Sequence, residues 1–397
     1  MVTESPESKP DIVEPTPRPR DATFDIVKGV GILEVMTHHL LSHSARKFTQ
    51  EGAWDWWAMQ IAHRVLHFAV PTFLLLSALL LAKSLLRHDP PNWRHFYFRR
   101  LQRTLLPYII WTGIYLLFRL KFAHNDAELE LRSVNLPLFG MLSIPRMLTE
   151  RELWVSGLLW GKTYYHLYFL GVLLQFSLLF GLLYPLMRRA QKPFSTIFVV
   201  SFVLQLFAFW LNAVFLYPIL HFTTPASSVL WYIPAFVLGT WLGLHYAEWE
   251  SLWKQWHTLF YLTAFCGLGI YLYLEIASMR GAEVNSYVYN FALTAYTTGT
   301  ALLLLRFGQV LAQKGRRGEI IQRIGNWSLP LFLIHPMALY FLSGPRLSAI
   351  WGRLPGGFIV LGVSMFAVSW AVSWLFMKAR LDRVCFGRLL STPSGNA

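Results

Sequence analysis

Long apolar runs recur along almost the whole chain, and they constrain the fold more than any other feature of the sequence. The stretches 73–82, 109–118 and 301–305 contain no charged residue. Only 14% of the 397 residues are charged, whereas an ordinary soluble domain carries about 25%. Because 55% of the residues are hydrophobic, too few polar side chains remain to cover a soluble surface. This excludes a soluble enzyme, a disordered protein and a disulfide-stapled secreted domain. It predicts an all-α, polytopic integral membrane bundle.

The apolar runs define ten candidate membrane helices, because a spanning helix needs roughly 20 mostly apolar residues. The ninth is short and contains Pro330 and Pro336, so we expect a kinked or broken helix there. The ten windows are 24–41, 61–81, 104–120, 164–186, 194–215, 229–246, 259–277, 287–305, 328–342 and 358–377.

The basic residues indicate the orientation of these helices. The net charge is +14, and lysine and arginine gather in 83–103, 306–323 and 378–388. Cytoplasmic loops of membrane proteins carry such an excess, so we expect both termini to be cytoplasmic and the long 121–161 segment to lie outside. This distribution fits contact with the lipid bilayer, and no aromatic-basic module suits a nucleic acid.

The chain divides into three parts. Residues 1–22 are polar and Pro-rich and predict a disordered cytoplasmic lead, 23–378 form the membrane domain, and 379–397 form a basic cytoplasmic tail. The two cysteines, Cys266 and Cys385, cannot form a disulfide framework.

The first window is unusual because it carries Asp25, Lys28, Glu34, His38 and His39. Ionisable residues inside a membrane are costly and mark a working site by default. Lys28 and His39 are eleven residues apart, which places them on one helix face about 16 Å apart along the axis. Glu34 and His38 are one turn apart and can pair. The alternative is that Lys28 reaches the inner interface and the histidines lie at the outer one.

The sequence around these residues resembles the membrane acyltransferase-3 family. Asp25-Ile-Val-Lys28-Gly29, with ten residues between Lys28 and His39, resembles its opening motif. Later stretches match the same family in order, and His166-Leu-Tyr-Phe169 is a weaker match. These stretches are Val70-Pro-Thr-Phe73 with Leu76-Ser77-Ala78, Phe96-Tyr-Phe-Arg-Arg100-Leu-Gln-Arg103 with Pro107, and Ile324-Gly-Asn-Trp-Ser328 with Leu333-Ile-His335-Pro336.

This sequence departs from the family pattern in two places. Ala78 stands where the family usually has glycine. Glu34 and His38 stand where apolar residues are usual.

The resemblance implies transfer of an acyl group, acetyl in the branch with lysine at position 28, from cytoplasmic acyl-CoA to a hydroxyl of a glycan or glycolipid. It also implies a bacterial inner (plasma) membrane protein of the cell envelope that modifies polysaccharide. His39 would act as the general base, because hydroxyl attack on a thioester needs a base that is neutral near pH 7. Lys28, Asp25 and Glu34 would complete the catalytic set. The sequence leaves homo-oligomerisation open.

Arginines suited to the CoA phosphates follow the second window. Arg100 and Arg103 are one turn apart, and Arg99 lies beside them; guanidinium groups bind phosphate through paired hydrogen bonds. The alternative is the ordinary basic bias of cytoplasmic loops.

Three further residues are candidates for substrate binding: Ser77, His166 and His335. We interpret Ser77 mainly as a small packing or hydrogen-bonding residue, with a nucleophilic role as the alternative. His335 lines the cavity in one interpretation and is a buried histidine bonded to a carbonyl in the other.

His63 and His67 are one turn apart, a spacing compatible with metal. No cysteine or carboxylate pair joins them in sequence, so we favour an interfacial role and expect no metal.

The main alternative function is a transporter or flippase of a glycan or lipid-linked intermediate, since such proteins also carry intramembrane charges. Transporters often have related halves with matching broken helices. Only the ninth window here is predicted to be broken, which favours the enzyme.

Overall fold

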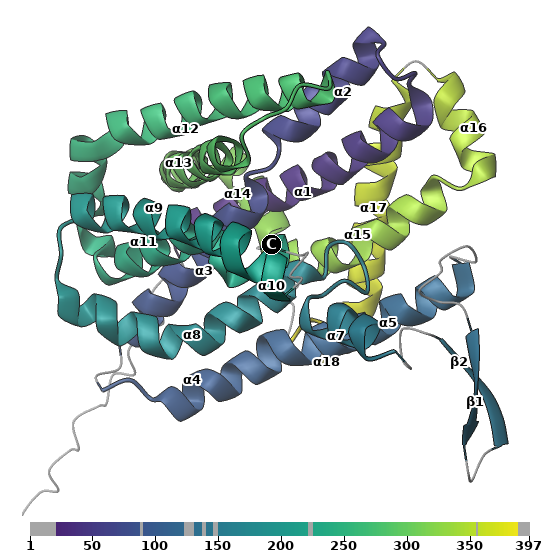
Figure 1. The fold of residues 1–397 in the computed structure, drawn as a ribbon, viewed down its shortest axis with the longest axis horizontal. Helices are drawn as coiled ribbons and strands as arrows, with labels where there is room; N and C mark the ends of the chain where they lie inside the picture. The colour runs from purple at the N-terminus through teal and green to yellow at the C-terminus, as the bar shows by residue number, and fades with distance from the viewer. Residues whose placement is uncertain are drawn as a thin grey trace, which may run out of the picture.

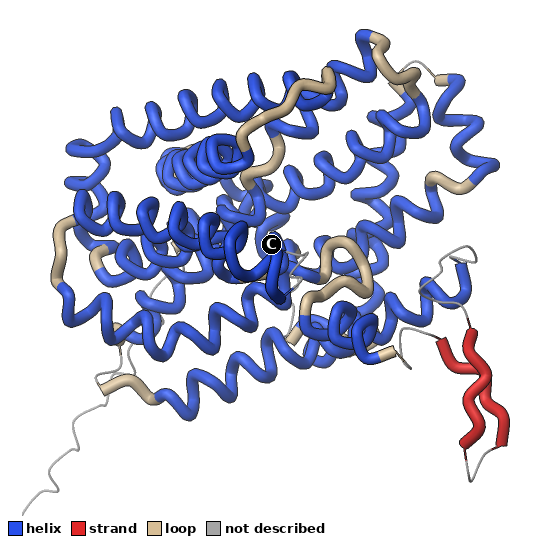
Figure 2. Tube along the Cα trace, viewed as in Figure 1, coloured by secondary structure: helices blue, strands red, loops and turns tan. Residues whose placement is uncertain are grey.

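The apolar runs form helices in the structure, a computed structural model that describes residues 21–87, 90–122, 131–136, 140–145, 150–220, 225–354 and 356–387. Figure 1 shows these helices as a bundle, and Figure 2 shows that the described strands form one small hairpin at its edge. The all-α membrane bundle predicted from the sequence is confirmed. Most of the predicted lead and the end of the predicted tail lie outside the described residues.

The first half of the bundle consists of α1 (Ala22–Phe48), α2 (Trp54–Val65), α3 (Ala69–Leu85), α4 (Trp93–Arg100), α5 (Leu106–Phe122), the hairpin β1–β2 (Leu131–Leu136 and Gly140–Pro145), α7 (Arg151–Leu159), α8 (Tyr168–Ala190), α9 (Phe194–Leu211) and α10 (Tyr217–Leu220). The second half consists of α11 (Ile233–Leu244), α12 (Trp249–Met279), α13 (Ser286–Ala312), α14 (Arg316–Asn326), α15 (Ser328–Leu342), α16 (Pro345–Arg353), α17 (Gly357–Lys378) and α18 (Asp382–Phe386).

Seven described helical stretches are long and apolar enough to cross a membrane. They correspond to seven of the ten predicted windows: Trp54–Leu85, Trp93–Phe122, Tyr168–Ala190, Phe194–Ile219, Tyr246–Met279, Ser286–Ala312 and Gly357–Lys378. The other three windows are helical too, but α1 carries ionisable residues, and Val229–Leu244 and Ser328–Leu342 are short. Which side of the membrane each end faces stays a prediction.

The ninth window was predicted to be kinked or broken, and the break is wrong because α15 is one continuous helix. The kink stays a prediction. Pro330 lies in the first turn of α15, where a proline costs no intrahelical hydrogen bond. Only Pro336 lies in the interior of α15, beyond its first turn.

The second window is interrupted where the sequence predicted a single span, and the helix at the third window begins earlier than its predicted start at residue 104. The second window consists of α2 and α3 with a short break between them, and Pro71 lies in the first turn of α3. The third begins as α4 and continues into α5 through a π-helical turn at Leu101–Leu105. Pro107 follows this turn, and a proline ring collides with the carbonyl of an ordinary preceding α-turn. The π-turn places Arg103 one turn before the proline.

Helix α11 packs directly on the backbone of α3. A Cβ atom at Gly239 or Gly243 would collide with the carbonyl oxygens of Leu75 and Leu79. Ala78 is fully buried and its Cβ lies against Gly239. Ala78 stands where the family has glycine, yet α3 and α11 still approach closely. The glycines that allow this approach are on α11 instead of α3.

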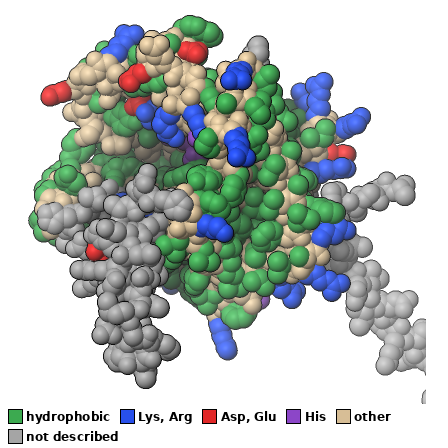
Figure 3. Space-filling view, turned by 90° about the vertical axis from the view of Figure 1, so that its right-hand side faces the viewer, with side chains coloured by type: hydrophobic (Ala, Val, Ile, Leu, Met, Phe, Trp, Pro, Cys, Tyr) green, Lys and Arg blue, Asp and Glu red, His purple; other side chains and the backbone are tan. Residues whose placement is uncertain are grey.

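The outer surface of the bundle is apolar. Figure 3 shows hydrophobic side chains over much of one face. On α8 and α9, Leu178 and Leu182 are 70% and 72% exposed, and Val199 and Val203 are also exposed. Large aliphatic side chains in such exposed positions are expected where lipid, rather than water, surrounds a helix.

Candidate active site

Helix α1 begins at a capped end and is held in place by α14. The Asp21 side chain accepts a hydrogen bond from the Thr23 amide at 3.0 Å, which is a standard N-cap. A Cβ atom at Gly325 of α14 would collide with the carbonyl of Asp25, so the two backbones are in direct contact. Asp25 is 1% exposed, and its carboxylate pairs with the Lys28 ammonium at 2.8 Å. This pairing fixes the predicted cation at a defined point on α1.

A cavity of about 230 Å³ contains the predicted general base. The other polar residues of its wall come from α1, the α2–α3 break, the start of α8 and the segment before it, the segment before α11, and α13. Its polar and aromatic lining includes Glu34, His38, His39, His67, His166, Tyr168, Tyr232, Asn290, Thr294, Thr297 and Thr298. We call it the histidine cavity.

The ring of His39 packs against the rings of Tyr165 and His335. Its centroid is 4.7 Å from that of Tyr165 and 5.4 Å from that of His335, which is stacked on it at 20°. The Nδ1 atom of His335 donates to the Leu331 carbonyl at 3.1 Å, because a carbonyl can only accept. His335 is fully buried, and its Nε2 atom has no hydrogen-bond partner among the described residues. It therefore packs against His39 as a buried histidine bonded to a carbonyl, and it is not among the residues that line the histidine cavity.

His166 also lies at this site. It is 2% exposed, its ring is 5.9 Å from that of His335 and 5.2 Å from that of Phe332, and it lines the histidine cavity. Neither ring nitrogen has a hydrogen-bond partner among the described residues. A buried imidazole with open nitrogens is costly, which is typical of a group that meets a polar ligand.

A second cavity, of about 520 Å³, contains the predicted phosphate-binding residues. Lys28, Ser77, Arg100 and Arg103 line it, together with Ser328 and the end of α18. We call it the basic cavity. Arg99 lines an adjoining cavity of about 320 Å³, whose wall also includes Ser77, Arg100 and Arg103. The fold thus brings together residues of α1, α3 and α4 that are far apart in the sequence.

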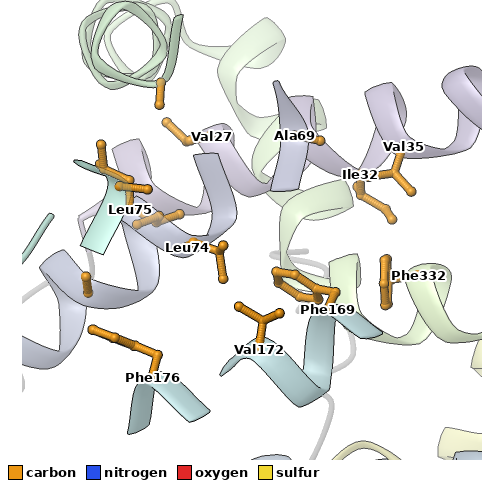
Figure 4. Close-up of a cluster of buried hydrophobic side chains, with 14 of the residues drawn as sticks. Val27, Ile32, Val35, Ala69, Leu74, Leu75, Phe169, Val172, Phe176 and Phe332 are labelled. Atoms are coloured by element: carbon orange, nitrogen blue, oxygen red, sulfur yellow. The ribbon is translucent and has the colours of Figure 1, made fainter. Parts of the chain in front are cut away.

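Two aromatic side chains belong to the walls of both cavities. Phe169 of α8 and Phe332 of α15 line the histidine cavity and the basic cavity alike. Their ring centroids are 5.3 Å apart, and Figure 4 shows them among the buried side chains of α1, α3, α8 and α15. The two cavities are therefore adjacent at this pair, with cations lining one and imidazoles lining the other.

The comparison with protein families agrees with this arrangement. A family model described as an acyltransferase domain, Acyl_transf_3, matches residues 21–376. The chain belongs to the acyltransferase-3 family. It is thus a multi-pass membrane acyltransferase. Neither the curated proteins nor the solved structures contain a match to it.

Glu34 and His38 of this acyltransferase have separate hydrogen-bond partners. The Nδ1 atom of His38 donates to the His63 carbonyl at 3.2 Å, whereas the Ala69 amide donates to Glu34. Glu34 is 6% exposed, and its Oε2 atom has no hydrogen-bond partner among the described residues. Both side chains line the histidine cavity, so the predicted contact between them is replaced by contacts to α2 and α3.

Sequence reasoning missed several residues of the acyltransferase site. Tyr165 packs on His39 but precedes the helix and has no motif of its own. Asn290, Thr294 and Thr297 form a polar stripe on α13 that faces the histidine cavity. Their spacing of four and three residues inside an apolar window was a readable signal, because polar groups on one face of a membrane helix rarely face lipid.

Proposed function

We propose that this acyltransferase transfers an acyl group, acetyl in the simplest case, from cytoplasmic acyl-CoA to a hydroxyl of a glycan or glycolipid, in a bacterial inner membrane. One observation carries the proposal. The basic cavity and the histidine cavity share Phe169 and Phe332 in their walls. A thioester reaching this pair from the cationic side would meet a hydroxyl that approaches from the imidazole side.

The basic cavity suits the phosphates of coenzyme A. Arg100 and Arg103 both line it, and guanidinium groups bind phosphate oxygens through directed pairs of N–H bonds. Lys28 adds a third cation, held toward the cavity by its pair with Asp25. Together the three cations oppose the negative charge that a CoA headgroup would bring into a half-buried site.

The chemical step needs a base on the other side. A neutral His39 takes the proton of the acceptor hydroxyl as the oxygen attacks the thioester carbonyl, which forms a tetrahedral intermediate. Collapse of this intermediate breaks the carbon–sulfur bond. The departing thiolate then takes the proton from His39, so the products are the ester and free CoA. Stacking on His335 and a tilted contact with Tyr165 hold the imidazole in one orientation for both proton transfers.

The histidine cavity suits a polar acceptor. Its wall carries amide, hydroxyl and phenol groups from Asn290, Thr294, Thr297, Tyr168 and Tyr232. A sugar ring presents several hydroxyls that both donate and accept, and a wall of such mixed groups can satisfy them. An apolar acceptor would leave these groups unpaired.

The test is direct acyl transfer by purified protein. The acyltransferase in detergent or nanodiscs is mixed with radiolabelled acetyl-CoA and with candidate glycans, and both labelled product and free CoA are measured. We expect acceptor-dependent release of CoA in equal amount to the label transferred. If labelled glycan crossed a vesicle membrane without any CoA release, the transporter interpretation would replace this one.

A further inference from the structure

Three histidines form a cluster beside the histidine cavity. His38 lies on α1, His63 on α2, and His67 in the break between α2 and α3. Their ligand nitrogens all lie within 4.8 Å of one another. The ring centroid of His38 is 4.0 Å from that of His63 and 4.8 Å from that of His67. The sequence showed only the His63–His67 pair, because His38 reaches it through the packing of α1 on α2.

Hydrogen bonds set the tautomers of two of these rings. The Nδ1 atom of His38 lies 3.2 Å from the His63 carbonyl, and that of His67 lies 3.0 Å from the Arg64 carbonyl. A carbonyl only accepts, so in each neutral ring Nδ1 carries the proton and Nε2 keeps its lone pair. The Tyr271 hydroxyl oxygen, 3.2 Å from the same Nδ1 atom of His67, then accepts from it. Metal-binding histidines characteristically donate their second nitrogen to a backbone carbonyl in this way. The Nδ1 atom of His63 is buried and has no hydrogen-bond partner among the described residues.

The surrounding charges tolerate a cation. Arg64 lies next to His63 in sequence, but its guanidinium pairs with the Glu275 carboxylate at 2.5 Å. Glu34 lines the same cavity as His38 and His67, and one of its buried carboxylate oxygens has no hydrogen-bond partner among the described residues. A cation in the cluster would offset the cost of burying that carboxylate.

We propose that His38, His63 and His67 bind a divalent transition-metal ion such as Zn²⁺. Three imidazoles without a thiolate suit zinc, copper, nickel or cobalt rather than calcium or magnesium. Three protein ligands leave the fourth position open, as in zinc sites that hold a water or a substrate oxygen. His38 and His67 both line the histidine cavity, so this open position faces the space in which His39 lies. The proposal replaces the sequence-based expectation that no metal is bound.

Binding requires only modest movement of the side chains. Zinc–nitrogen bonds of about 2.0–2.1 Å place tetrahedral ligands about 3.3 Å apart. The nitrogens of the cluster are within 4.8 Å, so each separation must shorten by at most about 1.5 Å to reach the tetrahedral spacing. Each ring stands on a separate turn of backbone, and rotation about its side-chain torsions can supply this movement.

The test measures metal binding and is independent of the proposed transfer reaction. The full chain is purified through a tag without histidine, treated with a chelator and titrated with Co²⁺. We expect about one equivalent to bind, with the visible absorption of four-coordinate Co²⁺, and Zn²⁺ to displace it. If the wild-type protein binds neither Co²⁺ nor Zn²⁺, the proposal is wrong, and no variant is needed to show this.

Variants then locate the site. His63 does not line the histidine cavity, so His63→Ala tests the metal without opening the cavity wall. Loss of a residue that only hydrogen-bonds to a metal ligand lowers metal affinity by about 10–100-fold. Loss of a ligand itself, as in His63→Ala, should lower the affinity further. His257→Ala is the matched control, because His257 is an exposed histidine on α12, and it should bind metal as wild type does. Size-exclusion profiles check folding. Equal affinity in His63→Ala and wild type would refute the assignment.

Discussion

Arg100→Ala should weaken the use of acyl-CoA without changing turnover at saturation. Arg100 is half-buried and lines both the basic cavity and its neighbour. Loss of a hydrogen bond to a charged group costs about 1.5–3 kcal/mol, which corresponds to a rise of about 10- to 150-fold in KM for acyl-CoA. Arg103 lines the same cavities but is exposed, so solvent screening should limit its effect to about 2- to 5-fold.

The assay follows CoA release against acyl-CoA concentration at fixed acceptor. Arg94→Ala is the matched control, because Arg94 is an exposed arginine of α4 that lines neither cavity. Arg100→Lys should recover only part of the loss, since a single ammonium cannot replace the guanidinium fork. An Arg100→Ala protein with wild-type KM, or a loss equally large in Arg94→Ala, would refute the phosphate-binding role.

Three further predictions concern α1, the helix contacts and the topology. Lys28→Ala should lose most activity, whereas Lys28→Arg should retain it if the site needs only a cation there, as steady-state rates can show. Gly243→Ala should lower the melting temperature of the purified protein by a few degrees, because overpacking costs about 1–3 kcal/mol. Gly269→Ala should leave the melting temperature unchanged, because a Cβ atom there meets open space. Equal melting temperatures for the two variants would contradict the α3–α11 packing. A tag inserted in 131–145 should be labelled by an impermeant reagent from outside intact cells, and labelling only after permeabilisation would reverse the predicted orientation.

The sequence predicted the elements of the fold better than their interruptions. Apolar length was sufficient to place the helices, because lipid leaves helical backbone as the main way to satisfy polar groups. The break between α2 and α3 and the π-turn at Leu101–Leu105 were not predicted. Both depend on how a proline near a helix start is accommodated by its neighbours. The continuous α15 shows the opposite error, in which Pro330 was given too much weight.

The sequence singled out individual candidate residues, but it did not predict how they are arranged in space. Motif spacing singled out Lys28, His39 and Arg100, and the structure places each beside a cavity. The sequence did not predict that Phe169 and Phe332 line both cavities, because their positions depend on the rotation of α8 and α15 about their own axes. The third histidine of the cluster was missed for the same reason, since only the packing of α1 on α2 brings His38 to His63.

The rate of acyl transfer in His39→Ala tests the central claim most directly. His43→Ala is the matched control, one turn further along α1 and outside both cavity walls. We predict that His39→Ala lowers single-turnover transfer by about 10²- to 10⁴-fold and leaves acyl-CoA binding and the melting temperature unchanged, while His43→Ala transfers at the wild-type rate. The wild-type rate should also fall as the pH is lowered and His39 becomes protonated. A folded His39→Ala protein that transfers the acyl group at the wild-type rate would contradict the account.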